Sequence, residues 1–243
     1  MVDDEKRSAA APRWRGRPGR LEVWYATLSD PRTGAGLWVH CETVAPLRGA
    51  AYGHGWATWF PPEGPPRTGR FGPVPAHPAT GPDWFACAGV RVADEQLRGR
   101  AGALAWELSW TDPTRPLWTF PRLAWERAML PGAQVVLAPT AEFTGRLHLD
   151  GAPARVEGWR GGVAHIYGHG NARRWGWMHA DLPPERCVSL GYTDPDGGTA
   201  VCTNTERADI RVEIDDRRWS VLGHAEVGLR GAEAPAVNER IPA

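Results

Sequence analysis

The chain has 243 residues, and its 28 lysines and arginines balance its 28 aspartates and glutamates. With 42% hydrophobic residues, a chain of this length can bury an ordinary core, so we expect a soluble globular protein. A formal charge of +0 without blocks of like charge gives no basic footprint. We therefore expect neither nucleic acid nor an anionic membrane as a partner.

Tryptophan is over-represented, with 14 residues against 4 tyrosines and 5 phenylalanines. Because the indole is large and its N–H needs a partner, this number indicates either a wide aromatic-walled cavity or a large flat interior. The 29 glycines and 23 prolines argue against long helices.

Residues 1–19 mix charges with Ala and Pro and show no hydrophobic periodicity, which predicts a disordered lead. They contain no apolar run of signal-peptide length, and no 18-residue apolar stretch occurs in the chain, so we expect a cytoplasmic protein without a membrane span. The cysteines form no C-x-x-C pair and are expected as small core residues, at Cys41, Cys87, Cys187 and Cys202.

The folded part is expected to begin near Leu21. The runs Leu21–Leu28 and Gly36–Val44 are aromatic and β-branched, and turn-forming residues separate them, so they predict a hairpin. Similar short runs follow at 52–60, 83–92, 103–110, 134–137, 143–149, 162–167, 174–182, 187–192, 199–203, 210–214 and 219–229. Only 93–100 and 122–129 are compatible with a helix. Many short strands at regular spacing predict an all-β fold of closed or sandwiched antiparallel sheets.

Two irregular stretches divide the chain. The proline-rich stretch 63–82 predicts an extended loop rather than a strand, placed over an opening. The stretch 111–131 predicts a crossover between two halves. We therefore expect an N-terminal β-barrel half over 20–130 and a C-terminal β-barrel half over 131–243.

The segment 161–182 is the most informative for function. Alternate side chains of a strand share a face, and one face here carries Trp175, Trp177, His179 and Asp181. Such a wall could hold an unsaturated ligand against the two indoles while His179 and Asp181 supply a proton donor, a base or an orienting hydrogen bond. The alternative is a barrel interior filled by tryptophan, with the imidazole and carboxyl groups hydrogen-bonded to each other or to backbone.

Further candidates precede that strand. His165 and Tyr167 alternate with apolar residues and point together, and His169 lies between two glycines, so we include all three with Asn171 in the predicted site. His165 is a catalytic candidate, and the other three are substrate-binding candidates. A metal site is not expected, because strand residues four apart lie about 13 Å from each other.

The N-terminal half offers a second wall. Trp38, His40 and Glu42 share one strand face, and Trp24 lies on the partner strand of the hairpin. Either these tryptophans and His40 bind substrate, or the strip is a surface with a solvated His–Glu pair. Two short motifs occur twice: Tyr-Gly-His-Gly at 52–55 and 167–170, and Trp-x-His at 38–40 and 177–179. The two motifs stand in opposite order in the two halves, so a tandem repeat does not explain them.

Several enzyme classes lack their motifs. No G-x-S-x-G occurs, no G-x-G-x-x-G follows a strand and opens a helix, and Lys6, the one lysine, cannot belong to a phosphate-binding loop. Hydrolases with a covalent intermediate, kinases and nicotinamide enzymes are therefore disfavoured, and we expect no cofactor.

Two longer segments carry a family resemblance. The hairpin WYATLSDPRTGAGLW at 24–38 and the run GVAHIYGHGNARRWGWMH at 162–179 resemble the lipocalin-like superfamily that includes carotenoid 1,2-hydratase, tocopherol cyclase and fungal Diels–Alderases. The segment FTGRLHLDG at 143–151 is similar to the one that precedes the second motif in that group.

The resemblance spans about 21–229. It implies two calycin-like barrels in tandem with a hydrophobic ligand in or between them. It also implies Asp181 as a proton-donating acid and Trp175 and Trp177 as cation-stabilising aromatics. The chain is shorter than the hydratases and has additional histidines around the motif.

These observations favour a cofactor-independent cyclase for a hydrophobic polyene, polyketide or isoprenoid, working by a [4+2] step or by acid catalysis. A carrier that binds such a molecule without turnover is the alternative, since barrel folds host both. A protein-interaction scaffold is a third interpretation.

Overall fold

The computed structural model describes residues 2–170, 174–182, 186–194, 200–202, 206–214 and 217–230, with side chains over 4–170. Its helices are short: α1 (Val2–Ala10) and α2 (Arg122–Glu126). The strands before residue 120 are β1 (Arg20–Ser29), β2 (Gly36–Ala45), β3 (Tyr52–Phe60), β4 (Arg67–Pro75), β5 (Phe85–Cys87), β6 (Val90–Ala93), β7 (Gln96–Ala101), β8 (Leu104–Thr111) and β9 (Leu117–Trp118). The later strands are β10 (Gly132–Leu149), β11 (Ala152–Gly168), β12 (Arg174–Leu182), β13 (Arg186–Asp194), β14 (Ala200–Cys202), β15 (Glu206–Ile214) and β16 (Arg217–Arg230).

One large antiparallel sheet contains the strands up to β11. Its order is β4-β3-β2-β1-β11-β10-β8-β7-β6-β5, with β9 paired to β10. β1 lies in the middle of the order and alternates strictly: Trp24, Ala26 and Leu28 belong to one core cluster, and the intervening apolar residues belong to another. Each strand near β1 therefore has two buried faces.

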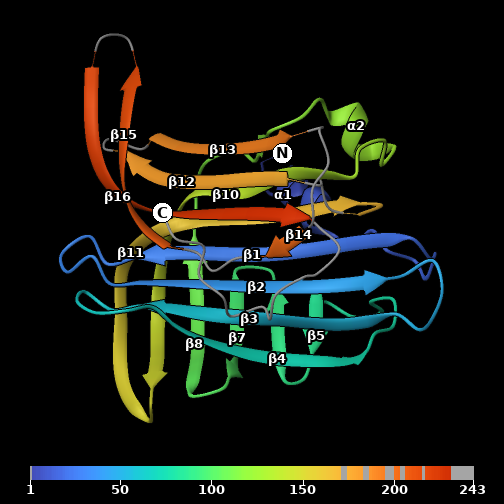
Figure 1. Cartoon of the computed structure of the whole chain (residues 1–243), viewed down its shortest axis with the longest axis horizontal. Helices are drawn as coiled ribbons and strands as arrows, with labels where there is room; N and C mark the ends of the chain where they lie inside the picture. The colour runs from blue at the N-terminus through green and yellow to red at the C-terminus, as the bar shows by residue number, and fades with distance from the viewer. Residues whose placement is uncertain are drawn as a thin grey trace.

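The sheet curls until its ends meet. In Figure 1, β1–β4 run across β5, β7 and β8, which lie at a steep angle to them. A Cβ on Gly69 of β4 would lie 1.9 Å from the carbonyl oxygen of Ala101 in β7, so only glycine permits this approach. The result is a nearly closed antiparallel barrel, which confirms the predicted all-β class.

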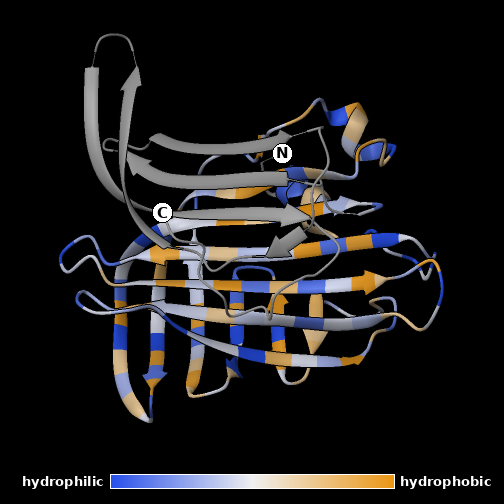
Figure 2. Ribbon diagram, viewed as in Figure 1, coloured by the Kyte–Doolittle hydropathy of each residue, from blue (hydrophilic) through white to orange (hydrophobic). Residues whose placement is uncertain are grey.

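The main core fills this barrel. Aromatic side chains from different strands meet there. The ring centroids of Trp59 in β3 and Trp159 in β11 lie 6.0 Å apart, and so do those of Trp110 and Phe143, which are direct partners on β8 and β10. Figure 2 shows hydrophobic and hydrophilic residues alternating along the lower parts of the strands, as expected where one side faces the core. Most of the described tryptophans therefore lie in the barrel interior.

The N-terminal segment is not the disordered lead that the sequence predicts. Residues 2–10 form α1, and Ala9, Ala10 and Trp14 are buried. Lys6 Nζ donates to the carbonyl oxygen of Asp112, and Arg13 donates to the carbonyl oxygens of Trp125 and Glu126. Local periodicity could not reveal these contacts, because they join the segment to residues about a hundred positions away.

Two further local predictions were wrong. The stretch 93–100 forms the turn and strands of the β6–β7 hairpin instead of a helix, and its side chains alternate between buried and exposed. Within the proline-rich stretch 63–82, β4 pairs with β3 as an ordinary strand. β4 ends the hydrogen-bonded order of the sheet, where prolines Pro73 and Pro75 are tolerated because one side of the strand needs no ladder donors.

The sheet boundary also differs from the expected division at 130/131. β10 and β11 pair with β8 and β1, so the first sheet extends to Gly168. β12–β16 form a second antiparallel sheet in the order β13-β12-β16-β14, with β15 on β16. A complete second barrel stays a prediction. None of the helices in the described ranges has the length and apolar character needed to cross a membrane.

Candidate functional site

The first sheet carries a Glu–His cluster on each of its two faces. Inside the barrel, Glu22 of β1 meets His165 of β11, and we refer to them as the inner pair. On the opposite face, Glu42 of β2 meets His40 of β2 and His54 of β3, and we refer to these three as the outer cluster. Their surroundings differ enough to separate a structural role from a chemical one.

The inner pair has all of its polar atoms engaged. His165 Nε2 lies 3.0 Å from Glu22 Oε1, and its Nδ1 lies 2.8 Å from the carbonyl oxygen of Ala9, which can only accept. The Glu22 carboxylate also accepts the backbone N–H groups of Arg13, at 2.5 Å, and Trp14, at 3.0 Å. Buried charges are tolerated when they are paired and hydrogen-bonded in this way.

Aromatic rings enclose the same pair. The Trp24 ring stacks on the His165 ring with centroids 4.4 Å apart, and Trp125 meets it edge-on at 4.8 Å. Trp24 Nε1 donates to the carbonyl oxygen of Ala10 at 3.2 Å. The inner pair therefore fastens residues 9–14 to the barrel. Each of its polar atoms already takes part in a hydrogen bond that holds the fold together.

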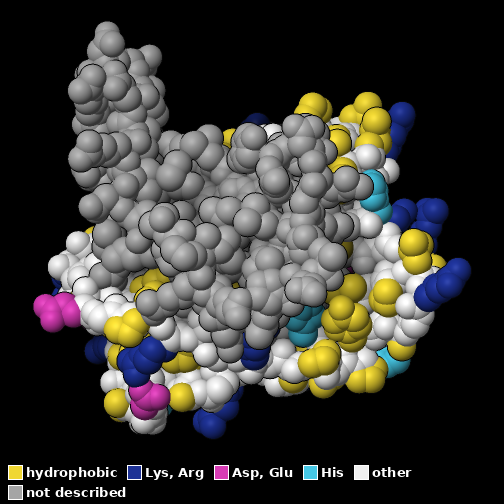
Figure 3. Space-filling model, in the orientation of Figure 1, with side chains coloured by type: hydrophobic (Ala, Val, Ile, Leu, Met, Phe, Trp, Pro, Cys, Tyr) yellow, Lys and Arg dark blue, Asp and Glu magenta, His cyan; other side chains and the backbone are white. Residues whose placement is uncertain are grey.

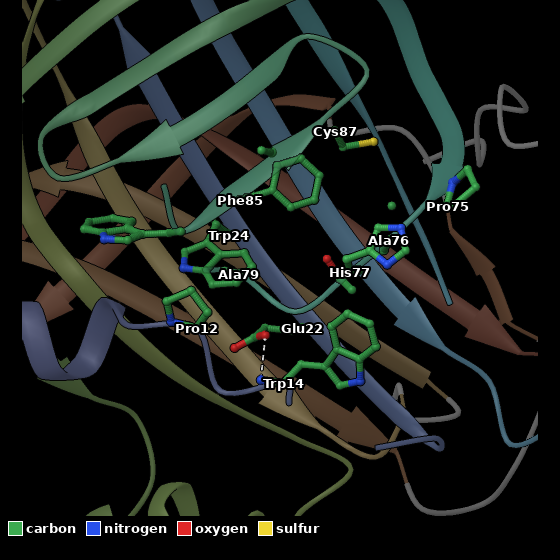
Figure 4. A pocket seen from close by; sticks show the side chains of 14 residues that line it. Pro12, Trp14, Glu22, Trp24, Pro75, Ala76, His77, Ala79, Phe85 and Cys87 are labelled. Atoms are coloured by element: carbon green, nitrogen blue, oxygen red, sulfur yellow. Dashed lines mark hydrogen bonds between the residues drawn. The ribbon is translucent and has the colours of Figure 1, made fainter. Parts of the chain in front are cut away.

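A small pocket of about 40 Å³, open on one side to solvent, lies beside the inner pair. Figure 4 shows Trp14 and Trp24 near the Glu22 carboxylate, with Phe85, His77 and Cys87 further along the wall. Burial raises the pKa of the Cys87 thiol, so it stays protonated. The pocket can hold a small apolar group, but its one carboxylate is already occupied by the N-terminal segment.

The outer cluster brings three ionisable side chains to one point. His54 lies opposite Glu42 across the β2–β3 ladder, and His40 lies two residues before Glu42 on the same strand face. Glu42 Oε2 lies 3.2 Å from His40 Nε2 and 3.7 Å from His54 Nε2. The exposed side-chain fractions are 11% for both His40 and Glu42 and 24% for His54. One carboxylate oxygen is thus shared by two imidazoles.

Aromatic rings surround the outer cluster. The His40 and Trp56 rings stack with centroids 3.9 Å apart at 10°, and Trp38 meets both edge-on, at 5.5 Å from His40 and 5.4 Å from Trp56. The ring centroids of Tyr52 and His54 lie 5.5 Å apart. Arg70 lies over the Trp56 ring. These rings form a hydrophobic wall with the acid–base groups set into it.

Electrostatics fixes much of the protonation of the outer cluster. Burial alone would raise the pKa of Glu42, but the hydrogen bond from His40 and the charges of both histidines more than offset it, so its pKa is lowered. For His54, burial lowers the pKa and outweighs the opposing effect of Glu42. Burial and Glu42 raise the pKa of Tyr52. At neutral pH the site therefore holds a carboxylate, a neutral imidazole at His54 and a protonated phenol.

A neutral polar group lies on the same face. Thr27 is opposite Trp38 across the β1–β2 ladder, and its hydroxyl is buried without a hydrogen-bond partner among the described residues. Unsatisfied buried polar atoms are uncommon in folded proteins and call for a partner.

The structure separates residues that the sequence grouped. Trp24, His165 and Tyr167 lie together inside the barrel, whereas Trp38 and His40 lie on the opposite face. Arg13 lies 4.9 Å above the Tyr167 ring. These positions show which predicted residues share a face of the sheet, and the predicted roles in binding and catalysis stay predictions.

The remaining predicted residues are placed only in part. His169 is exposed in the bend after β11. The side chains of Trp175, Trp177, His179, Asp181 and Asn171 lie outside the described ones. Within the described residues, no group of three or more His, Cys, Asp or Glu has an arrangement suited to a metal ion.

His54, Trp56 and Glu22 were missed by reasoning from the sequence. His54 had one signal, its place in the first Tyr-Gly-His-Gly motif, and strand parity places His54 and Trp56 on one face. Glu22 had none, because its partner His165 lies 143 positions away.

The sequence of this chain matches a family model described as tocopherol cyclase-like over residues 18–189. The chain belongs to the tocopherol cyclase-like family. Two uncharacterized proteins from strains of Mycobacterium tuberculosis are 55% identical to it, over 100% of this chain and 96% of each relative. The resemblance seen in the sequence is therefore confirmed.

Solved structures share the fold. Kievitone hydratase from Nectria haematococca matches with a TM-score of 0.55 at 8% identity, covering 92% of both chains. An AttH-like protein from Nitrosomonas europaea matches with a TM-score of 0.52 at 13% identity, covering 86% of this chain and 92% of that one. CghA, solved with Sch210972, matches with a TM-score of 0.51 at 11% identity, covering 87% and 89%. At these identities the similarity establishes the architecture, and function depends on the site.

Proposed function

We propose that this protein is a cofactor-independent cyclase that closes a ring in a hydrophobic isoprenoid, polyketide or polyene substrate at the outer cluster. The observation that carries the proposal is the Glu42 carboxylate shared by His40 and His54 on a wall of Trp38 and Trp56. Buried acid–base groups with shifted pKa values in apolar surroundings are typical of catalytic sites. The family name and the hydratase among the structural relatives support the same class of chemistry.

Cyclisation and hydration of an alkene share one net reaction, the addition of O–H across C=C. A new C–O bond forms, the π bond breaks, and one proton moves from oxygen to the other carbon. No electron is gained or lost, so a proton acceptor and a proton donor suffice. In a cyclase the attacking oxygen belongs to the substrate, and in a hydratase it belongs to water.

The outer cluster has groups for both proton transfers. His54, neutral at pH 7, accepts the proton from the attacking hydroxyl, and Glu42 stabilises the imidazolium that forms. The Tyr52 phenol stays protonated and serves as a hydrogen-bond donor to a substrate oxygen. Trp38 and Trp56 are buried behind these groups, with His40 and Arg70 over the Trp56 ring, and they give the site an apolar back that holds the imidazoles in place.

The predicted β12 residues extend this proposal. We propose that Asp181 and His179 supply the acid that protonates carbon and that Trp175 and Trp177 add to the aromatic wall, with Asn171 at its edge. If the acid acts in this way, Asp181→Asn abolishes turnover and leaves ligand binding intact. Unchanged turnover would instead favour a [4+2] closure, in which the pocket works by holding the reacting carbons close together.

The proposal is tested with the purified protein. Mass spectrometry first identifies any small molecule that co-purifies, and the protein is then incubated with linear prenylated hydroquinones and conjugated polyene precursors. The expected product has the mass of its precursor and one ring more. If every bound molecule is recovered unchanged and every precursor stays linear, the protein is a carrier and the cyclase proposal is wrong.

A further inference from the structure

The segment between β8 and β10 has apolar side chains on both of its sides. We refer to residues Arg115–Met129, which include β9 and α2, as the cap segment. On its inner side, Trp125 is buried against the His165 ring, and Trp118 meets Trp125 edge-on at 6.0 Å. These contacts hold the segment over the end of the barrel.

The outer side of the cap segment exposes large hydrophobic residues to solvent. The exposed fractions are 40% for Leu117, 37% for Phe120, 50% for Leu123 and 61% for Met129. They make up four of the six large hydrophobic residues exposed among the described side chains, so the exposure is concentrated rather than scattered. Figure 3 shows hydrophobic side chains gathered over α2 with basic side chains next to them. Concentrated apolar exposure of this kind marks a binding surface.

The cap segment carries more positive than negative charge. Arg115, Arg122 and Arg127 are exposed and Glu126 is the one acidic residue in the range. Arg122 Nε lies 2.9 Å from Glu126 Oε1. Arg115 and Arg127 have no ion pair among the described residues. The cap segment is therefore positive although the whole chain has a formal charge of +0, and an argument from net charge overlooks it.

We propose that the cap segment docks this protein on an anionic lipid surface. Leu117, Phe120, Leu123 and Met129 enter the boundary between headgroups and acyl chains, and the arginines contact the lipid phosphates. Apolar side chains interspersed with arginine are the composition of segments that bind at this boundary. The proposal concerns a surface separate from the outer cluster, so it does not depend on the proposed cyclisation.

Vesicle flotation tests the proposal without any activity assay. Full-length protein is mixed with vesicles of phosphatidylcholine alone or of phosphatidylcholine and phosphatidylglycerol in equal parts. We expect flotation with the anionic vesicles, weakened by salt. The variant Leu123→Ser with Arg127→Gln, which changes one apolar and one basic residue of the cap, should lower the partition coefficient about tenfold.

A matched control exists elsewhere on the surface. Leu47→Ser with Arg48→Gln makes the same two exchanges at exposed neighbours in the β2–β3 connection, and it should leave flotation unchanged. Absence of flotation for the native protein, or equal loss in both variants, would overturn the proposal. So would a native dimer in light scattering that the cap variant alone converts to a monomer without any vesicle binding, because the patch would then be an interface between two copies.

Discussion

Both faces of the first sheet carry a glutamate beside histidine, but the two clusters differ in their hydrogen-bond partners and in their exposure to solvent. Glu22 and His165, inside the barrel, direct their polar atoms at each other and at the backbone of residues 9–14. Glu42, on the other face, shares one oxygen between His40 and His54, and the latter is partly exposed. The comparison indicates that residue type alone does not make a catalytic group. What matters is whether its hydrogen-bonding capacity is already used by the fold.

The sharpest test of this comparison is Glu42→Gln. We expect kcat for ring closure to fall by about 100-fold or more, because the amide cannot stabilise a protonated His54. The free energy of unfolding should fall less than in Glu22→Gln, because Glu42 accepts from His40 but from no backbone N–H group among the described residues, and the amide keeps the size of the side chain. The matched variant Glu22→Gln is assayed beside it at a temperature where both are folded. Loss of turnover in Glu22→Gln alone would reverse the assignment of the two clusters.

The stability of the two variants should show the opposite order. Glu22→Gln removes the charge that His165 and two backbone N–H groups bind, and breaking a buried pair of this kind costs about 3 to 5 kcal/mol in the free energy of unfolding. Urea denaturation followed by tryptophan fluorescence measures the difference. A loss in Glu42→Gln equal to that in Glu22→Gln would show that both clusters serve the fold.

Trp56→Leu tests the aromatic wall separately from the acid–base groups. The stacking of Trp56 on His40 would be lost, and aromatic pairs contribute about 0.5 to 1.5 kcal/mol beyond buried area. We expect kcat/KM to fall by about 3- to 10-fold, with the binding of the apolar ligand weakened in parallel. Trp59→Leu, a change inside the barrel, is the control. It should reduce stability without a specific effect on ligand binding.

The pH dependence of stability should carry the signature of the outer cluster. The pKa values of His54 and Glu42 are lowered in the folded state, so the unfolded chain takes up their protons at higher pH than the native chain does. The free energy of unfolding should therefore fall as the pH drops below about 6.5 for His54 and again below about 4.5 for Glu42. Denaturation curves across this range in His54→Gln should lack the first decline. Its persistence would assign that decline to another group.

The smallest effect is expected at the second Tyr-Gly-His-Gly motif. His169 is exposed after β11, so His169→Ala should change the free energy of unfolding by less than about 0.5 kcal/mol. Turnover should be unchanged, in contrast to His54→Ala at the first motif. A large loss of turnover in His169→Ala would bring it back into the site that the sequence predicts.

Much of the local structure was predictable from the sequence. The aromatic and β-branched runs at 21–28 and 36–44 predict β1 and β2, and the i, i+2 spacing places Trp38, His40 and Glu42 on one strand face. The helix expected over 122–129 corresponds to α2. The error at 1–19 arises because residues about a hundred positions away hold that segment in place. At 63–82 and 93–100, strand pairing with neighbours along the chain, β4 with β3 and β7 with β6 and β8, outweighed the local residue preferences.

The sequence by itself determined the all-β class, the family and the parity of side chains along each strand, since parity depends only on a two-residue period. Only the tertiary structure decided which faces meet. It paired Glu22 with a histidine 143 positions away, and the register of β2 on β3 placed His54 beside Glu42. Register and curvature depend on the whole sheet, and for that reason a wall of Trp24, Trp38 and His40 expected from the hairpin became residues on two opposite faces.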